Sequence, residues 1–239
     1  KMIKNKDFFL ELGCEEIPAR FISSLSSSLQ LTFEKFLVKN RIQFESIKVF
    51  STYRRLALYV KKVSTIQDDS IEYVKGPPEK IVYDDNGDFS KASIGFAKKN
   101  NIDLSKCIIK EINGKKHLSY ESFLKGKPTN GILSEIIPQI ITSIPLNIAM
   151  KWADKTHQFV RPVKWIVALF DAEVINFKLF DVNSSNYSFG HRFLSNGETS
   201  LGKKFTVNLK KSILDQYQNH KVLLDSSKRE TSIKQQLLD

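Results

Sequence analysis

The 239-residue sequence has few cysteines and histidines and no long apolar run. Its only cysteines, Cys14 and Cys107, are too few for a disulfide framework, and neither has a second ligand at zinc-site spacing. No apolar run approaches the roughly 18 residues of a spanning helix. The N-terminal stretch also lacks the apolar segment of a signal peptide. We therefore expect a cytoplasmic protein that binds neither a metal ion nor a membrane.

Motifs of the common catalytic centres are missing as well. The sequence has no glycine-rich phosphate loop, no GxSxG elbow and no HExxH string. Its four histidines are scattered, and none stands at a recognisable spacing from a nucleophile. The sequence therefore predicts no catalytic residues.

Arginine is scarce although positive charge is abundant. The formal net charge is +11, and the chain contains 30 lysines but only seven arginines. Such a charge attracts polyanions such as nucleic acid, but a lysine-rich codon supply accounts for it equally well. Arginine carries a planar fork of donors that matches a phosphate or a carboxylate. Six of the seven stand in short, unusual strings: EEIPAR (Arg20), TYRRLA (Arg54, Arg55), VRPVKW (Arg161), FGHRF (Arg192) and SKRETSI (Arg229).

Residues 1–64 have the pattern of a β-α-β-β unit. We expect a strand at 8–12, a helix that begins near Pro18, and two strands at 47–52 and 54–63 that are joined by a tight turn. Apolar and more polar residues alternate along the last strand, which is typical of a sheet with one covered face. A linker is expected at 64–70.

Residues 65–239 predict a larger, mixed domain, so that the fold class is α+β with two domains. Its first half contains a rigid turn at Gly76-Pro77-Pro78, a short helix capped by Ser90, and a hairpin turn at Asn113-Gly114. An isoleucine-rich stripe then predicts a helix over 132–144.

The second half of this domain is expected to contain further strands and two helices. Strands are predicted at 165–170 and 221–225, with a polar loop between them at 184–193. A capping box at Ser227 and Glu230 predicts the start of the last helix. That helix reaches Asp239 without a closing glycine, so we expect a truncated piece of a longer multi-domain chain.

Cations and aromatic residues alternate in the string MKWADKTHQFVRPVKW. A surface for single-stranded nucleic acid needs this combination, because rings stack on bases while charges hold phosphates. The same string is equally compatible with buried tryptophans and an arginine that fixes a loop. The string GHRF adds a histidine that titrates near neutrality. The candidate RNA-binding residues are Lys151, Trp152, Arg161, Lys164, Trp165, His191 and Arg192.

Six collinear strings run from about Phe8 to the last helix: FFLELGCEEIPARF, STYRRLALYV, VKGPP, ASIGFAKKN, MKWADKTHQFVRPVKW and GHRF. Together they resemble the N-terminal portion of the beta subunit of the bacterial tetrameric glycyl-tRNA synthetase. Two positions depart from that family, which usually has proline in place of Tyr53 and glycine in place of Ala153. The family's later regions, an HD-like helical domain and an anticodon-binding domain, are absent.

The resemblance implies a two-subunit enzyme. Its alpha subunit activates glycine with ATP and Mg²⁺, and its beta subunit binds tRNA(Gly) and is needed to transfer the glycyl group. We therefore expect this chain to be inactive alone, to bind no cofactor, and to contact the alpha subunit, tRNA(Gly) and a second beta subunit. The candidate subunit-interface residues are Glu15, Glu16, Arg20, Arg54 and Arg55.

Three alternatives remain open. Arg54 or Arg55 forms a structural ion pair with Glu15 or Glu16 in place of an interface contact. The second domain is an editing-like hydrolase that uses His191, although the smallest amino acid has the least need of editing because larger competitors are excluded sterically. The whole chain is a purely structural scaffold whose charge reflects codon supply.

Overall fold

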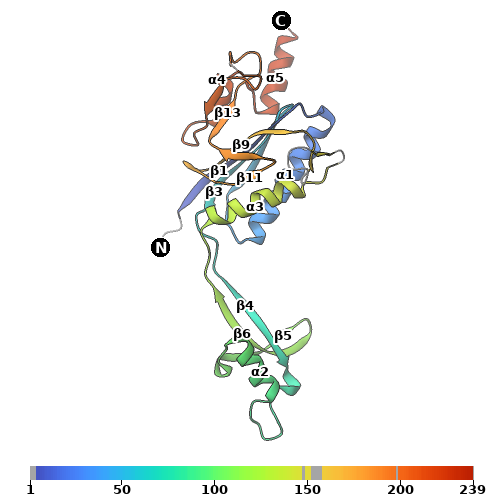
Figure 1. Cartoon of the computed structure of the whole chain (residues 1–239), viewed down its shortest axis with the longest axis vertical. Helices are drawn as coiled ribbons and strands as arrows, with labels where there is room; N and C mark the ends of the chain where they lie inside the picture. The colour runs from blue at the N-terminus through green and yellow to red at the C-terminus, as the bar shows by residue number, and fades with distance from the viewer. Residues whose placement is uncertain (1–3, 147–148, 152–157, 198, 239) are drawn as a thin grey trace. The chain divides into compact units, whose positions relative to one another are not determined.

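The computed structural model describes residues 4–146, 149–151, 158–197 and 199–238, and its fold is α+β. The chain forms two compact units (Figure 1). The larger unit comprises Lys1–Gln67 and Lys127–Asp239, and the smaller unit comprises Asp68–Gly126. Among the helices so described, none has both the length and the apolar character to cross a membrane.

A single sheet organises the larger unit. Its strands follow the order β11-β12-β9-β1-β3-β2, with β10 also paired to β9. All described pairings are antiparallel except that of β12 with β9. The strands are β1 (Asn5–Cys14), β2 (Ser46–Thr52), β3 (Arg55–Ser64), β9 (Val163–Phe170), β10 (Glu173–Val174), β11 (Lys178–Leu179) and β12 (Val182–Ser185).

Both faces of this sheet are buried, because successive side chains of a strand point to opposite faces. On one face, Phe8, Leu10 and Leu12 of β1 join a core with helices α1 (Ala19–Lys39) and α3 (Thr129–Ser143). On the other face, Phe9 belongs to a second core that includes Trp165 and Tyr217. The expectation of one covered face is therefore wrong, since a second layer covers the polar side of β3.

The second core is closed by elements from the end of the chain. They are the strand pair β13 (Tyr187–Phe189) and β14 (Lys204–Thr206), helix α4 (Ile213–Asn219) and the segment that leads to helix α5 (Ser226–Gln236). A short strand pair, β7 (Met150–Lys151) and β8 (Gln158–Phe159), lies outside the main sheet. Large apolar side chains from distant segments thus meet around β1.

The compact units do not coincide with the expected division at residue 64. The predicted elements β1, α1, β2 and β3 are present in their predicted order. However, β9 pairs with β1 over the register Phe8↔Phe170 to Cys14↔Val163, so the chain after 127 completes the sheet that the first 64 residues begin. The segment excluded from this sheet is 68–126, and the chain leaves the larger unit through the predicted linker.

The smaller unit is a three-stranded sheet with a helix. Strands β4 (Ser70–Pro78), β6 (Lys115–Leu124) and β5 (Cys107–Ile112) pair in that order, and the helix is α2 (Lys91–Asn100). Two single-turn helices, Glu79–Ile81 and Leu104–Lys106, complete it. The hairpin at Asn113-Gly114 and the cap at Ser90 are confirmed: both hairpin residues have positive φ, and Ser90 Oγ accepts a hydrogen bond from the Ser93 N–H.

Several local predictions are wrong. Gly76 and the two prolines after it form the end of β4, where the register shifts before Pro78 pairs with His117, and not a separate turn. The predicted loop 184–193 contributes residues to β12 and β13. Residues 221–225 form no strand. Helix α5 begins one residue before the predicted capping box of Ser227 and Glu230, because the Asp225 carboxylate accepts hydrogen bonds from the free N–H groups of the first turn.

Candidate functional site: a basic pocket

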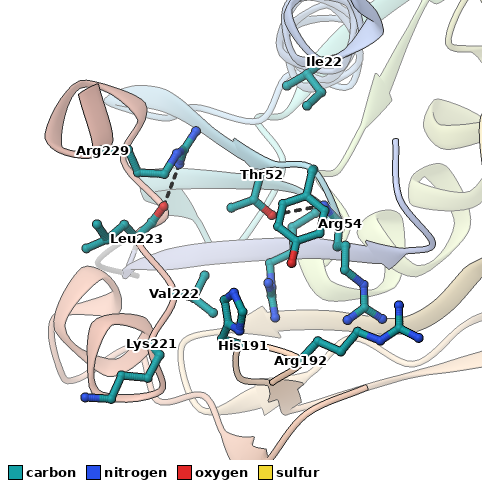
Figure 2. Close-up of a pocket in the computed structure, with 11 residues that line it drawn as sticks. Ile22, Thr52, Arg54, His191, Arg192, Lys221, Val222, Leu223 and Arg229 are labelled. Carbon is teal, nitrogen blue, oxygen red and sulfur yellow. Dashed lines mark hydrogen bonds between the residues drawn. The ribbon is translucent and has the colours of Figure 1, made fainter. Parts of the chain in front are cut away.

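A pocket in the larger unit brings together basic residues from three distant segments (Figure 2). Its volume is about 300 Å³, and no aspartate or glutamate is among its lining residues. We call it the basic pocket and define it by its cationic and titratable lining: Arg54, Arg55, His191, Arg192, Lys221 and Arg229. Four of the seven arginines of the chain therefore meet at one place.

Arg54 lies at the turn between β2 and β3. Its N–H donates to Thr52 Oγ1 at 3.2 Å, which fixes the turn. Only 2% of the residue is exposed, and its Nε has no hydrogen-bond partner within the described residues. Burial lowers the pKa of Arg54, and the neighbouring charges of Arg55 and Arg192 lower it further. A buried, incompletely bonded guanidinium among other cations is costly, and an anion would relieve that cost.

Arg55 forms an ion pair with Glu11, a fully buried carboxylate in the middle of β1. Glu11 Oε1 accepts hydrogen bonds from Arg55 Nε at 3.1 Å, Trp165 Nε1 at 2.9 Å and Ser188 Oγ at 2.9 Å, and Oε2 accepts one from the Tyr217 hydroxyl. Burial, and then the charge of Glu11, raise the pKa of Tyr217. We call these five residues the Glu11 network; it joins β1, β3, β9, β13 and α4.

Gly13 makes room for the indole of Trp165 inside this network. A Cβ at Gly13 would lie 1.8 Å from Trp165 Cε2, so any larger residue would displace the ring. The ring in turn lies beside both guanidinium groups, with its centroid 5.8 Å from Arg54 Cζ and 5.3 Å from Arg55 Cζ. The strand glycine therefore positions an aromatic face against the pocket's two most buried cations.

The Glu11 network also fixes the loop that carries His191. Arg55 Nη2 donates to the carbonyls of Phe189 and Gly190, the second at 3.3 Å. Gly190 has no positive φ, but a Cβ there would lie 2.6 Å from Ser195 Cβ, so close packing and not conformation requires the glycine. The loop is closed by the His191 N–H, which donates to the carbonyl of His220 at 2.9 Å.

His191 and Arg192 line the pocket, and Phe193 follows them at its rim. His191 Nδ1 accepts hydrogen bonds from the N–H groups of Phe193 and Leu194, both at 3.2 Å, so no carboxylate orients the ring in the way that hydrolytic triads require. Arg192 Nη1 lies 3.6 Å from Glu16 Oε1. Phe193 is 75% exposed directly beside it.

Comparisons with known proteins agree with the resemblance in the sequence. The family described as "Glycyl-tRNA synthetase beta subunit" matches residues 8–239. This chain belongs to that family. It is 34% identical over 237 residues to the glycine–tRNA ligase beta subunit of Listeria monocytogenes serotype 4b, and 37% identical over 227 residues to that of Natranaerobius thermophilus.

A third relative, the glycine–tRNA ligase beta subunit of Syntrophotalea carbinolica, is 35% identical over 233 residues. These alignments cover 95–98% of this chain. The chain spans about a third of the length of these curated relatives. It therefore matches one portion of each relative.

Some members of the two groups predicted for RNA binding and for a subunit interface meet on one surface. Lys164 Nζ lies 3.4 Å from Glu15 Oε1, and Arg161 Nε donates to the carbonyl of Glu16 at 3.0 Å. Arg192, from the RNA-binding group, pairs with the same Glu16. This cluster, which we call the Glu15–Glu16 surface, adjoins the basic pocket through Arg192.

Within the described residues, no side-chain hydrogen bond or ion pair joins the other predicted residues to that surface. Trp165 is only 2% exposed, so it is a core residue and offers no open ring face to a base. Lys151 is exposed in the short strand β7, and Arg20 is exposed on α1 with its guanidinium 4.8 Å from the Phe21 ring centroid. Trp152 lies outside the described residues.

The partner of Arg55 differs from the one expected. Its carboxylate is Glu11 and neither Glu15 nor Glu16, because Arg55 stands opposite Gly13 in the register and diagonal to Glu11 on the same face. The signal was a glutamate within the apolar string FFLELG, which marks a buried charge that needs partners. Arg229 was noted only as a rare arginine; its Nη1 donates to the carbonyls of Leu223 and Leu224 at 2.6 and 2.9 Å.

The chemistry available at the pocket is that of anion binding. Its lining offers guanidinium, ammonium and imidazole groups but no carboxylate that would coordinate Mg²⁺. Across the described part of the chain, no three His, Cys, Asp or Glu side chains group together as metal ligands. Phosphate or carboxylate oxygens are the groups that such a lining can hold.

Proposed function

We propose that this chain is the noncatalytic portion of the ligase beta subunit that binds tRNA(Gly) and assembles with the alpha subunit, which uses ATP and Mg²⁺ to attach glycine to the tRNA. The observation that carries this proposal is the basic pocket, in which four arginines converge without a lining acid. Contacts of this kind with phosphates fix the register and orientation of an RNA on its protein.

The contribution of this chain to glycyl transfer is positional. A bound tRNA held by the pocket and the Glu15–Glu16 surface has fewer orientations to lose when its acceptor end enters the alpha-subunit site. The side chain best suited to proton transfer, His191, has its Nδ1 occupied by two backbone N–H groups. A hydrolytic role is therefore less well supported than a binding role.

The test is a filter-binding titration of the 239-residue chain with tRNA(Gly) against salt. With three to four phosphate contacts, a fourfold rise in salt should weaken binding roughly 20- to 150-fold. Lys164→Gln, on the Glu15–Glu16 surface, should reduce the slope of log K against log salt by about 1. Lys115→Gln, in the smaller unit, removes the same charge and should leave the slope unchanged.

Assembly is tested separately by co-purification with the alpha subunit. Retention of the chain on immobilised alpha subunit at low salt is the expected result. A chain that binds neither tRNA(Gly) nor the alpha subunit at low salt, where electrostatic contacts are strongest, would contradict the proposal.

A further inference from the structure

Arg54 is the most buried cation of the basic pocket, and its charge has no counter-ion among the described residues that line it. Within the described residues, no carboxylate oxygen lies within ion-pair distance of its guanidinium, whereas Arg55 has Glu11 and Arg192 has Glu16. In Figure 2, the side chains of Arg54 and Arg192 end near each other. Two guanidinium groups that line the same pocket can both donate hydrogen bonds to one tetrahedral anion. The geometry therefore calls for a ligand with a phosphate-like group at this point.

Apolar and aromatic groups adjoin these cations. Ile22, Val222 and Leu223 line the same pocket, and so does Tyr53, which is 40% exposed. Phe193 follows Arg192 in the chain and is 75% exposed, and Arg192 Cζ lies 5.5 Å from its ring centroid. An inorganic anion gains nothing from contact with apolar and aromatic side chains. A nucleotide has both a phosphate that the guanidinium groups can bind and a base that can stack on the rings.

We propose that the basic pocket receives one nucleotide from an unpaired stretch of RNA. Arg54 and Arg192 hold its phosphate, its base lies against Tyr53, and Phe193 on the rim takes the neighbouring base. This inference rests on the proposed function, and it narrows the RNA contact from tRNA in general to a nucleotide that has left the helical stack.

An unpaired strand is required because of depth and size. Arg54 is 2% exposed and lines a pocket of about 300 Å³, so the phosphate must enter the pocket to reach it. The phosphates of a duplex are held on a stiff, convex helix, and its bases are stacked and closed to protein rings. A splayed nucleotide brings both groups into the pocket at once.

The experiment measures binding of the 239-residue chain to a fluorescein-labelled hexanucleotide RNA, in single-stranded form and annealed to its complement. Adenosine monophosphate, inorganic phosphate and an acidic peptide with a free C-terminal carboxylate serve as competitors. The variants are Arg54→Lys, Arg192→Gln and Phe193→Ser, with Lys115→Gln as the charge-matched control outside the pocket. Thermal unfolding of each variant is recorded by tryptophan fluorescence.

The single strand should bind at least about tenfold more tightly than the duplex. Arg54→Lys keeps the charge but loses the fork, and it should weaken single-strand binding about tenfold or more. Phe193→Ser should weaken it roughly 5- to 150-fold, the loss typical of one stacked base. Arg192 and Phe193 are on the rim, so these two variants remain informative if Arg54→Lys unfolds. Lys115→Gln should bind as the wild type does.

Four results would overturn the inference. Equal binding of duplex and single strand would indicate a general phosphate contact. Inorganic phosphate competing as well as adenosine monophosphate would indicate a site for a bare anion, and the peptide competing better than either would indicate a protein partner. If tRNA(Gly) binds but all pocket variants bind the hexanucleotide normally, this inference fails alone. If the hexanucleotide enters the pocket but tRNA(Gly) does not bind, the proposed function fails alone.

Discussion

The smaller unit contains more lysine per residue than the larger unit, yet only the larger unit has a net charge. The smaller unit contains ten lysines and ten acidic residues, so its formal charge is zero, and the +11 of the chain belongs to the larger unit. None of the seven arginines lies in the smaller unit. A codon supply that favours lysine would act on both units alike. It therefore accounts for the lysines but not for the asymmetry, which comes from arginines and from fewer acids.

The units also differ in what stabilises them. The larger unit buries three charged side chains: Glu11 and Arg55 are paired inside its second core, and Arg54 lies beside them. The smaller unit has an exposed ion pair, Lys116 with Glu79 at 3.9 Å, and depends on local turns and caps. Electrostatic changes should therefore act mainly on the larger unit, and backbone changes at turns mainly on the smaller one.

The largest effect is expected from Glu11→Ala. Removal of this carboxylate leaves Arg55 buried without a counter-ion, which costs about 3–5 kcal/mol of unfolding free energy. Both tryptophans of the sequence lie outside 68–126, so urea unfolding followed by tryptophan fluorescence reports on the larger unit. Amide hydrogen exchange of β4, β5 and β6 reports on the smaller unit and should be unchanged.

The matched control for this prediction is Glu121→Ala in the smaller unit. Glu121 is exposed on β6, where Oε1 accepts a hydrogen bond from the Tyr73 hydroxyl at 2.8 Å. Its removal should change stability by no more than about 0.5 kcal/mol. A comparable loss from both substitutions, or a loss of protection in both units from Glu11→Ala, would show that the units do not differ in this way.

The next effect is expected from Gly114→Ala in the smaller unit. Gly114 has φ +74°, a region in which a side chain costs about 1–2 kcal/mol. Gly95→Ala is the counterpart in the same unit, because Gly95 lies inside α2 with open space at its Cβ position, and alanine there should stabilise by about 0.5–1 kcal/mol. The backbone amides of β5 and β6 should lose protection against hydrogen exchange in Gly114→Ala and keep it in Gly95→Ala. The two substitutions should change the stability of the smaller unit in opposite directions. If both destabilise it, the positive φ of the turn is not the cause of the first loss.

The same contrast separates what could be predicted from the sequence. In the smaller unit, the hairpin at Asn113-Gly114 and the cap at Ser90 depend on residues only a few positions apart, and both were predicted correctly. In the larger unit, β1 pairs with β9 across about 150 positions, and no local pattern carries such a pairing. The division was placed at residue 64 because local sequence patterns do not indicate contacts between distant segments.

The candidate site was predictable only in its residue types. Rare arginines in short strings indicated Arg54, Arg55 and Arg192 as residues in which fork geometry matters. Their convergence with Arg229 could not be read, since it depends on the fold of the whole larger unit. The string MKWADKTHQFVRPVKW left open whether its tryptophans are buried, and Trp165 proved to be core because Gly13 leaves space for its ring.

The smallest effect is expected at two helix caps that contrast the units. Asp225 caps α5 in the larger unit: Oδ1 accepts from the N–H groups of Ser227 and Lys228 at 3.0 and 3.2 Å, and Oδ2 lies 3.0 Å from Lys48 Nζ. Ser90 caps α2 in the smaller unit with a hydroxyl that does not titrate. Only the first cap should respond to acid.

The sign follows from the pKa of Asp225, which is lowered chiefly by the hydrogen bond from Lys48 and then by the one from the Lys228 N–H. Its contribution, about 1 kcal/mol for a cap, is present above the unfolded value of about 3.9 and is lost as pH falls through the lower folded value. Hydrogen exchange of α5 should therefore accelerate in acid, while α2 is unchanged. Asp225→Asn keeps the cap without the charge and should remove this step; an unchanged acid step in that variant would assign it to another carboxylate.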